Sequence, residues 1–236
     1  MRTTTSCQFC GAILNARTLQ LGGQPVFAGF EQCQCEGAKA ARAEQARLEE
    51  EQAKREREER LRSAIRRAGI MPRFENARHP MAPELARALE DKQNVYIFGD
   101  VGTLKTHLAS ATARYLVANG MAGVRFSAMW KVLDEIKAGF REGYDPLPKY
   151  QGARVLVLDD FGKESPTDFA LERMFALIDE RSARLLPTCI TTQYRPGQLI
   201  DRLAKNGDRD TATAIVSRLR QDCRKVELSG GDRRLG

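Results

Sequence analysis

Short apolar runs alternate with longer amphipathic stretches through the last two thirds of the 236-residue chain. Apolar runs bounded by polar residues predict buried strands, and the amphipathic stretches predict the helices between them. Five strands are expected, at 94–98, 124–127, 154–158, 188–192 and 225–228, with helices at about 105–119, 129–140 and 169–184. Strands that alternate with helices at this spacing form a parallel sheet covered by helices on both faces, an α/β fold.

Residues 38–69 have a different pattern, rich in Ala, Glu, Arg, Lys and Gln and with no Gly or Pro before Gly69. Acidic residues precede basic ones by four positions, as in Glu50 and Lys54, a spacing that stabilises a helix. Large apolar residues are too sparse for a coiled coil. A solvated connecting helix is therefore predicted, with nucleic-acid binding by its ten basic residues as the alternative.

Four of the six cysteines lie in the first 35 residues, as the pairs Cys7-x2-Cys10 and Cys33-x-Cys35. Four thiolates in a segment with little apolar content suit tetrahedral Zn²⁺, whose binding free energy can replace a missing core. The role would be structural, because all four ligands come from the protein. Four unrelated reduced cysteines are the alternative.

Composition narrows the class of protein further. No apolar run approaches the roughly 18 residues of a membrane span, and the N-terminus leads into no apolar signal core, so a cytoplasmic protein without a membrane partner is expected. The formal net charge of +7 is modest and favours polyanionic partners such as nucleic acid or nucleotides.

The loop after the first predicted strand of the sheet has the pattern of a phosphate-binding loop. It reads Gly99-Asp100-Val101-Gly102-Thr103-Leu104-Lys105-Thr106, which departs from G-x-x-x-x-G-K-[ST] only at Leu104. Its backbone N–H groups would cradle phosphates, Lys105 would reach the β- and γ-phosphates of ATP, and the Thr106 hydroxyl would hold Mg²⁺. A strand-to-helix turn that happens to contain Gly and Lys is the alternative.

A second motif follows about 50 residues later, where the strand at 154–158 ends in two carboxylates. Asp159 can hold Mg²⁺, and Asp160 can orient or activate a water molecule. Two acids that merely cap the following loop are the alternative.

From Gly69 to its end, the chain resembles the AAA+ ATPases of the DnaC/DnaI helicase-loader group, to which the IstB transposition helpers are related. The segments that carry the resemblance are 69–74 (GIMPRF), 105–109 (KTHLA), 158–162 (LDDFG), 191–193 (TTQ) and 217–219 (SRL). This resemblance implies a P-loop AAA+ domain at 70–236. The cysteine spacing and the composition place a zinc-binding module at 1–37 and a charged helical linker at 38–69 before it.

The resemblance also implies roles for further residues. Gln193 would be sensor 1, where relatives usually carry Asn, and Arg218 would be an arginine finger that reaches the γ-phosphate bound by a neighbouring subunit. A terminal arginine, Arg233 or Arg234, would be a further phosphate sensor. The zinc module would grip a hexameric replicative helicase, as in DnaI-like relatives.

Leu104 is the main departure from the family pattern. If the backbone requires φ > 0 at this position, a leucine costs about 1–2 kcal/mol and can crowd the phosphate path. Weakened nucleotide binding, or a rebuilt loop, is expected.

Aromatic and basic residues gather at 125–141, the region that lines the path of single-stranded DNA in the loader and initiator group. Lys131, Lys137 and Arg141 are candidate phosphate contacts. Phe126 and Trp130 are predicted to be core residues rather than stacking platforms.

The sequence thus predicts an ATP-dependent loader of a replicative helicase onto single-stranded DNA, of bacterial or phage origin, that self-associates through its ATPase domain. ATP, Mg²⁺ and Zn²⁺ are the expected cofactors. One alternative is an IstB-like ATPase that regulates a transposase. Another is a non-hydrolysing adaptor between DNA and a partner protein, with a P-loop impaired by Leu104.

Overall fold

The computed structural model describes residues 3–22, 24–165, 167–206 and 208–230. The chain divides into two compact units, residues 1–60 and 61–236. Within the described ranges, no helix combines the length and the apolar character needed to cross a membrane.

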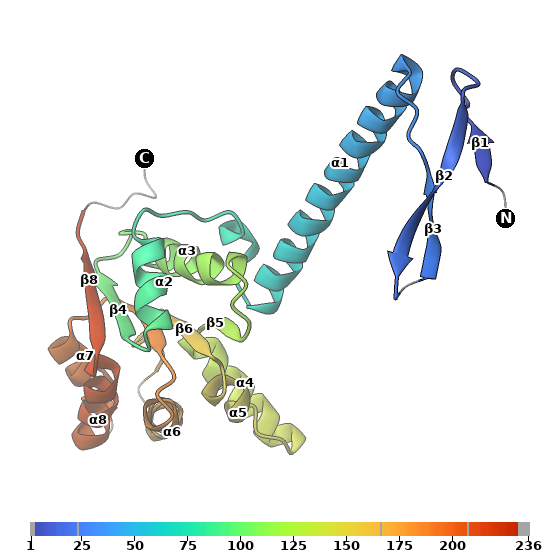
Figure 1. Ribbon diagram of the computed structural model, residues 1–236. Coiled ribbons are helices and arrows are strands. Elements are labelled where there is room, and N and C mark those ends of the chain that lie inside the picture. Colours follow the sequence, from blue (N-terminus) through green and yellow to red (C-terminus); the bar gives the residue numbers. More distant parts are fainter. Residues whose placement is uncertain (1–2, 23, 166, 207, 231–236) are drawn as a thin grey trace. The chain divides into compact units, whose positions relative to one another are not determined.

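The first unit contains a small antiparallel sheet that the sequence did not predict. Its strands, in the order β1-β2-β3, are Thr4–Ser6, Ile13–Leu21 and Gln24–Phe30, and helix α1, Glu36–Arg67, begins after the last cysteine pair (Figure 1). Most strand side chains are exposed, Ile13 to 74% and Leu21 to 65%. Because neither face is covered, the strands lack the apolar-in, polar-out alternation on which strand prediction depends.

The second unit is built on a parallel sheet with the order β5-β6-β7-β4-β8. Its strands are β4 Asn94–Gly99, β5 Val124–Ala128, β6 Val155–Asp159, β7 Thr188–Thr192 and β8 Cys223–Leu228. The five-stranded parallel sheet predicted from the sequence is confirmed. Within this sheet, β4 comes first along the chain but lies between β7 and β8, so the carboxyl ends of β4 and β7 are adjacent.

Helices cover both faces of this sheet (Figure 1). The predicted helices are present as α3 Lys105–Ala118, α4 Met129–Glu142 and α6 Asp168–Ala183. The structure adds α2 Ala82–Glu90, α5 Leu147–Gln151, α7 Pro196–Leu203, α8 Arg209–Arg220 and two short 3₁₀ turns, Pro72–Phe74 and Ala204–Asn206.

Alternate residues of β4 belong to two apolar cores, one on each face of the sheet. Val95 and Ile97 pack with α2, α3 and the last turns of α1, whereas Tyr96 and Phe98 pack with α4 to α8. Ile65 of α1 is only 2% exposed in the first of these cores. The end of the charged helix is therefore part of the second unit.

Candidate nucleotide, zinc and nucleic-acid sites

The predicted phosphate-binding loop connects the carboxyl end of β4 to the amino end of α3. Gly99 has φ of 150°, and a Cβ there would lie 2.0 Å from the carbonyl oxygen of Leu228, so only glycine fits. Lys105 Nζ donates hydrogen bonds to the Gly99 and Asp100 carbonyl oxygens, at 2.7 and 2.5 Å, and the lysine is 7% exposed. The ammonium group therefore lies inside the loop.

The two residues expected to hold Mg²⁺ are in direct contact. Thr106 Oγ1 donates to Asp159, at 2.9 Å from Oδ1, and Thr191 Oγ1 donates to the same carboxylate oxygen at 2.6 Å. Burial raises the pKa of Asp159, and the hydrogen bonds from Thr191 and Thr106 oppose this increase only in part. Hydroxyl and carboxylate oxygens are hard ligands that suit Mg²⁺, so the residues present fit this ion.

Asp160 and Gln193 lie at the same edge of the sheet as the loop. Asp160 has φ of 57°, its N–H donates to Thr191 Oγ1 at 2.9 Å, and its Oδ1 is 2.7 Å from Lys163 Nζ. Gln193 follows β7 and lines a cavity of about 390 Å³ together with Gly99. Both residues thus lie at the same edge of the sheet as the loop, and their catalytic roles stay predictions.

Two residues near these carboxylates received no role from the sequence. Thr191 bonds both Asp159 and Asp160, and Lys163 pairs with Asp160. Strand pairing could have indicated Thr191, because β7 lies beside β6 and both strands end at this edge. A single sequence contains no comparable signal for Lys163.

Leu104 adopts the left-handed backbone conformation, with φ of 64° and ψ of 25°. The backbone at this position therefore does have a positive φ, the condition under which a leucine is expected to be strained. Leu104 lines a cavity of about 200 Å³ together with Arg73, Phe74, Thr106 and His107.

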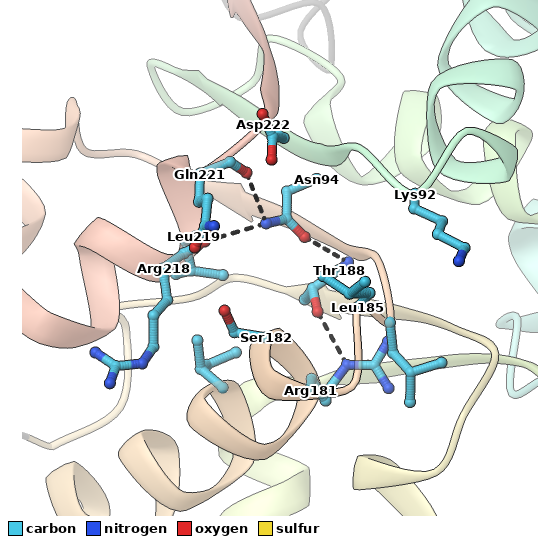
Figure 2. Close-up of a pocket in the computed structure, with 12 residues that line it drawn as sticks. Lys92, Asn94, Arg181, Ser182, Leu185, Thr188, Arg218, Leu219, Gln221 and Asp222 are labelled. Carbon is cyan, nitrogen blue, oxygen red and sulfur yellow. Dashed lines mark hydrogen bonds between the residues drawn. The ribbon is translucent and has the colours of Figure 1, made fainter.

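Arg218 lies on α8 and pairs within its own chain. Its Nε donates to Asp179 Oδ1 at 2.6 Å, and its guanidinium lies 5.1 Å from the centre of the Phe175 ring. Asn94 Nδ2 donates to the Arg218 carbonyl oxygen at 3.1 Å, which fixes this turn of α8 against β4 (Figure 2). The side chain is partly exposed, and its action on a neighbouring subunit stays a prediction. Arg233 and Arg234 lie outside the described residues.

A cavity of about 40 Å³ lies at the other edge of the sheet, where β4 and β7 begin (Figure 2). Beside it, the guanidinium of Arg181, 1% exposed, donates to the Thr188 hydroxyl at 2.9 Å and to backbone carbonyl oxygens. Those oxygens belong to Tyr150, Gln151, Ala153 and Pro187. These contacts hold α6 against the end of α5 and the loops before β6 and β7, so we assign Arg181 a structural role.

The four N-terminal cysteines come together as predicted. Their Sγ atoms all lie within 4.8 Å of one another, with 3.8 Å between Cys7 and Cys35 and 3.4 Å between Cys10 and Cys33. None forms a disulfide. Zinc bound tetrahedrally at about 2.3 Å holds its sulfur atoms roughly 3.8 Å apart, so the cluster fits Zn²⁺.

The thiols of this cluster differ in acidity. Backbone N–H groups of Phe9 and Cys10 lower the pKa of Cys7 to about 6. The backbone N–H of Ala12 acts in the same direction on Cys10, but the neighbouring thiols of Cys33 and Cys35 raise its pKa to about 12. A cation among the four sulfur atoms would allow all of them to ionise together.

Helix α4 exposes aromatic and basic side chains. The prediction that Phe126 is buried is confirmed, since it is 3% exposed, but the same prediction for Trp130 is wrong, since it is 46% exposed. Trp130 falls outside the buried stripe of α4, which is formed by Met129, Val132, Leu133 and Ile136. The Lys131 ammonium lies 5.4 Å from the Trp130 ring centre.

Two more cations of this region lie near aromatic rings. Lys137 Nζ lies 5.6 Å from the ring centre of Phe169, which packs edge-on against Phe140. Arg173 extends over both rings, within 6.0 Å of their centres. Arg141 is exposed. This surface combines stacking groups with positive charge, the chemistry that binds single strands without sequence preference.

Comparison with known proteins agrees with this architecture. Residues 82–236 match the family model of IstB-like ATP-binding proteins. The ATP-binding protein Rv3427c of a Mycobacterium tuberculosis insertion sequence is 29% identical over 112 residues, 47% of this chain and 44% of that protein. This chain therefore spans less than half the length of that curated relative.

Solved structures with a similar fold include DnaC and DnaI. The DnaC helicase loader matches with a TM-score of 0.53 and 26% identity, over 67% of this chain and all of that one. DnaI matches with a TM-score of 0.56 and 22% identity, over 63% of this chain and 83% of that one. The predicted P-loop AAA+ fold and the resemblance to the DnaC/DnaI group are confirmed.

Proposed function

Because the chain belongs to the family of IstB-like ATP-binding proteins, we propose that it binds MgATP and uses it to control the loading of a replicative DNA helicase onto single-stranded DNA. The observation that carries the nucleotide part is the Thr106–Asp159 hydrogen bond, which joins the phosphate-binding loop to the carboxylate after β6. In P-loop proteins these two groups hold Mg²⁺ on the phosphates.

Each residue of the site would have its own role in the binding and hydrolysis of ATP. The loop N–H groups and Lys105 bind the phosphates, and Thr106 and Asp159 hold the metal ion, which neutralises charge on the transferred phosphoryl group. Asp160 and Gln193 orient the attacking water. Arg218 is partly exposed on α8 and would contact the γ-phosphate bound by a second copy of the chain.

The loader function is favoured by the unit in front of the nucleotide-binding domain. A four-cysteine cluster that fits Zn²⁺ lies at the start of a 32-residue helix, and the helicase loader DnaC has the same fold as the domain that follows. The cysteine unit would contact the helicase, and the exposed Trp130, Lys131 and Lys137 would contact single-stranded DNA in an assembled oligomer.

A transposase regulator is the second candidate. It is favoured by the family model itself and by the insertion-sequence relative from Mycobacterium tuberculosis. The two candidates share the nucleotide chemistry and differ in the protein that the N-terminal unit binds.

Mixing two defective variants tests the shared chemistry. Asp160→Asn and Arg218→Ala proteins should each hydrolyse ATP poorly in the presence of single-stranded DNA. If Arg218 acts on the neighbouring subunit, the mixture forms interfaces with an intact Asp160 on one side and an intact Arg218 on the other, and activity returns in part. If the two variants bind ATP and self-associate but their mixture shows no recovery of ATP hydrolysis, a site formed by Asp160 of one subunit and Arg218 of its neighbour is contradicted.

A further inference from the structure

The cavity beside Leu104 adjoins the phosphate-binding loop directly. Leu104 is the last residue of the loop, and Thr106 and His107 belong to the first turn of α3. Arg73 and Phe74, from the 3₁₀ turn before α2, form the facing wall. A group that lies in this cavity is therefore next to the end of α3 at which phosphates are expected.

The residues that line the cavity also contact one another and their neighbours. The rings of Phe74 and His107 pack edge-on, with centres 6.0 Å apart and planes at 78°. His107 Nε2 lies 3.0 Å from the Arg78 carbonyl oxygen, which orients the imidazole. The Arg73 guanidinium lies 4.5 Å from the centre of the Phe74 ring. Two flat rings, one cation and one aliphatic side chain thus face a common space.

This lining suits a nucleobase. Ligand pockets for planar heterocycles are mainly apolar and aromatic, with a few polar groups at the edge, and here the guanidinium and the imidazole supply those groups. The ribose of a nucleotide separates its base from its phosphates by only a short distance. A base that belongs to a triphosphate held by the loop can therefore reach this cavity.

We propose that Leu104 contacts the base of the bound nucleotide, so that the residue that breaks the glycine pattern of the loop serves as an apolar wall of the base pocket. This inference rests on the proposed nucleotide site and adds a residue to it. A glycine has no side chain with which to form this wall. Leu104 has a left-handed backbone, with φ of 64°, and is one of the residues that line the cavity.

The proposal separates the base from the phosphates in a measurable way. Removal of the leucine side chain beyond Cβ should lower the affinity for ligands that carry a base. The affinity for ligands that consist only of phosphates should stay unchanged. Leu104→Ala is the suitable variant because alanine keeps the Cβ and with it the backbone preferences of an L-residue. Leu185→Ala is the matched control, since Leu185 is also a leucine with positive φ (51°) but lies at the opposite edge of the sheet.

Isothermal titration calorimetry with ATP and with inorganic triphosphate, both with Mg²⁺, tests the proposal on the full chain. Leu104→Ala should bind ATP about threefold to tenfold more weakly, from the loss of three partly buried carbon atoms, and bind triphosphate within twofold of the wild type. Leu185→Ala should match the wild type for both ligands. Unchanged ATP affinity, or a parallel loss for both ligands, would overturn the role of Leu104. A wild-type chain that binds neither ligand would instead refute the nucleotide site, and this inference with it.

Discussion

Lys163 Nζ lies 2.7 Å from Asp160 Oδ1, so the carboxylate expected to act on water is paired with a cation three residues away. Both side chains are partly exposed, 42% for the lysine and 29% for the aspartate. Lys163 also lines a cavity of about 290 Å³ with Trp130 and Lys137, on the surface assigned to single-stranded DNA. Lys163 therefore contacts both Asp160 of the nucleotide site and the cavity on the candidate DNA surface.

Replacement of Lys163 by alanine should increase ATP turnover measured without DNA. The ammonium group pairs with the Asp160 carboxylate and competes with water for it, so its removal leaves the carboxylate available to water. We expect an increase of about twofold to tenfold, because a partly exposed pair contributes only roughly 1 kcal/mol. Lys149→Ala is the control, since Lys149 pairs with Glu135 away from the loop. Equal or lower turnover in Lys163→Ala would show that the pair does not restrain Asp160.

Replacement of Leu104 by glycine should stabilise the folded chain. The left-handed conformation is already present in the described structure, so the strain acts on folding rather than only on ligand binding. Relief of about 1–2 kcal/mol is offset in part because glycine increases the entropy of the unfolded chain, which leaves roughly 1 kcal/mol. Urea unfolding measures this difference. Gly120→Ala is the mirror control: φ there is 84° and a Cβ meets open space, so that variant should lose stability. A destabilised Leu104→Gly protein would contradict the strain argument.

Replacement of Arg181 by methionine should destabilise the second unit strongly. The variant removes the guanidinium that donates to four carbonyl oxygens and one hydroxyl around it, at a cost of about 3 kcal/mol or more. Arg184→Met, at the C-cap of the same helix, removes only a surface pair with Glu180 and should change stability by less than about 1 kcal/mol. Similar unfolding midpoints for the two variants would show that the buried network is dispensable.

The sequence identified the elements that its local patterns encode. Apolar runs indicated all five strands of the parallel sheet, and the two nucleotide motifs indicated Thr106 and Asp159, which the structure joins by a hydrogen bond. Contacts between distant segments were not predictable in the same way. The network around Arg181 joins residues 28 to 31 positions apart, and a single sequence contains no signal for it.

The error at Trp130 has a simple physical cause. An aromatic residue near a strand is usually buried, but Trp130 is the second residue of α4, and the helical period directs Met129 and Leu133 to the core instead. The strands of the first unit were missed for a related reason, because their side chains are exposed on both faces.

Replacement of Cys7 by serine should abolish tight zinc binding. Loss of one thiolate leaves three sulfur ligands, and the binding free energy that would order residues 1–37 falls accordingly. The zinc content of the purified full chain, measured by inductively coupled plasma mass spectrometry, should drop from about one ion per chain to a small fraction of an ion per chain. Cys223→Ser, which removes a thiol outside the cluster, should retain the ion. A wild-type chain without zinc, or a Cys7→Ser chain with a full complement, would contradict the assignment.

Copurification of the full chain with a replicative helicase, with and without ATP, tests the proposed function most directly. The helicase should be retained by the wild-type chain, in an amount that changes when ATP is added, and should be lost by Cys7→Ser but not by Cys223→Ser. The same assay with a transposase as the partner separates the two candidate functions. No retention of the helicase in either condition would contradict the loader function.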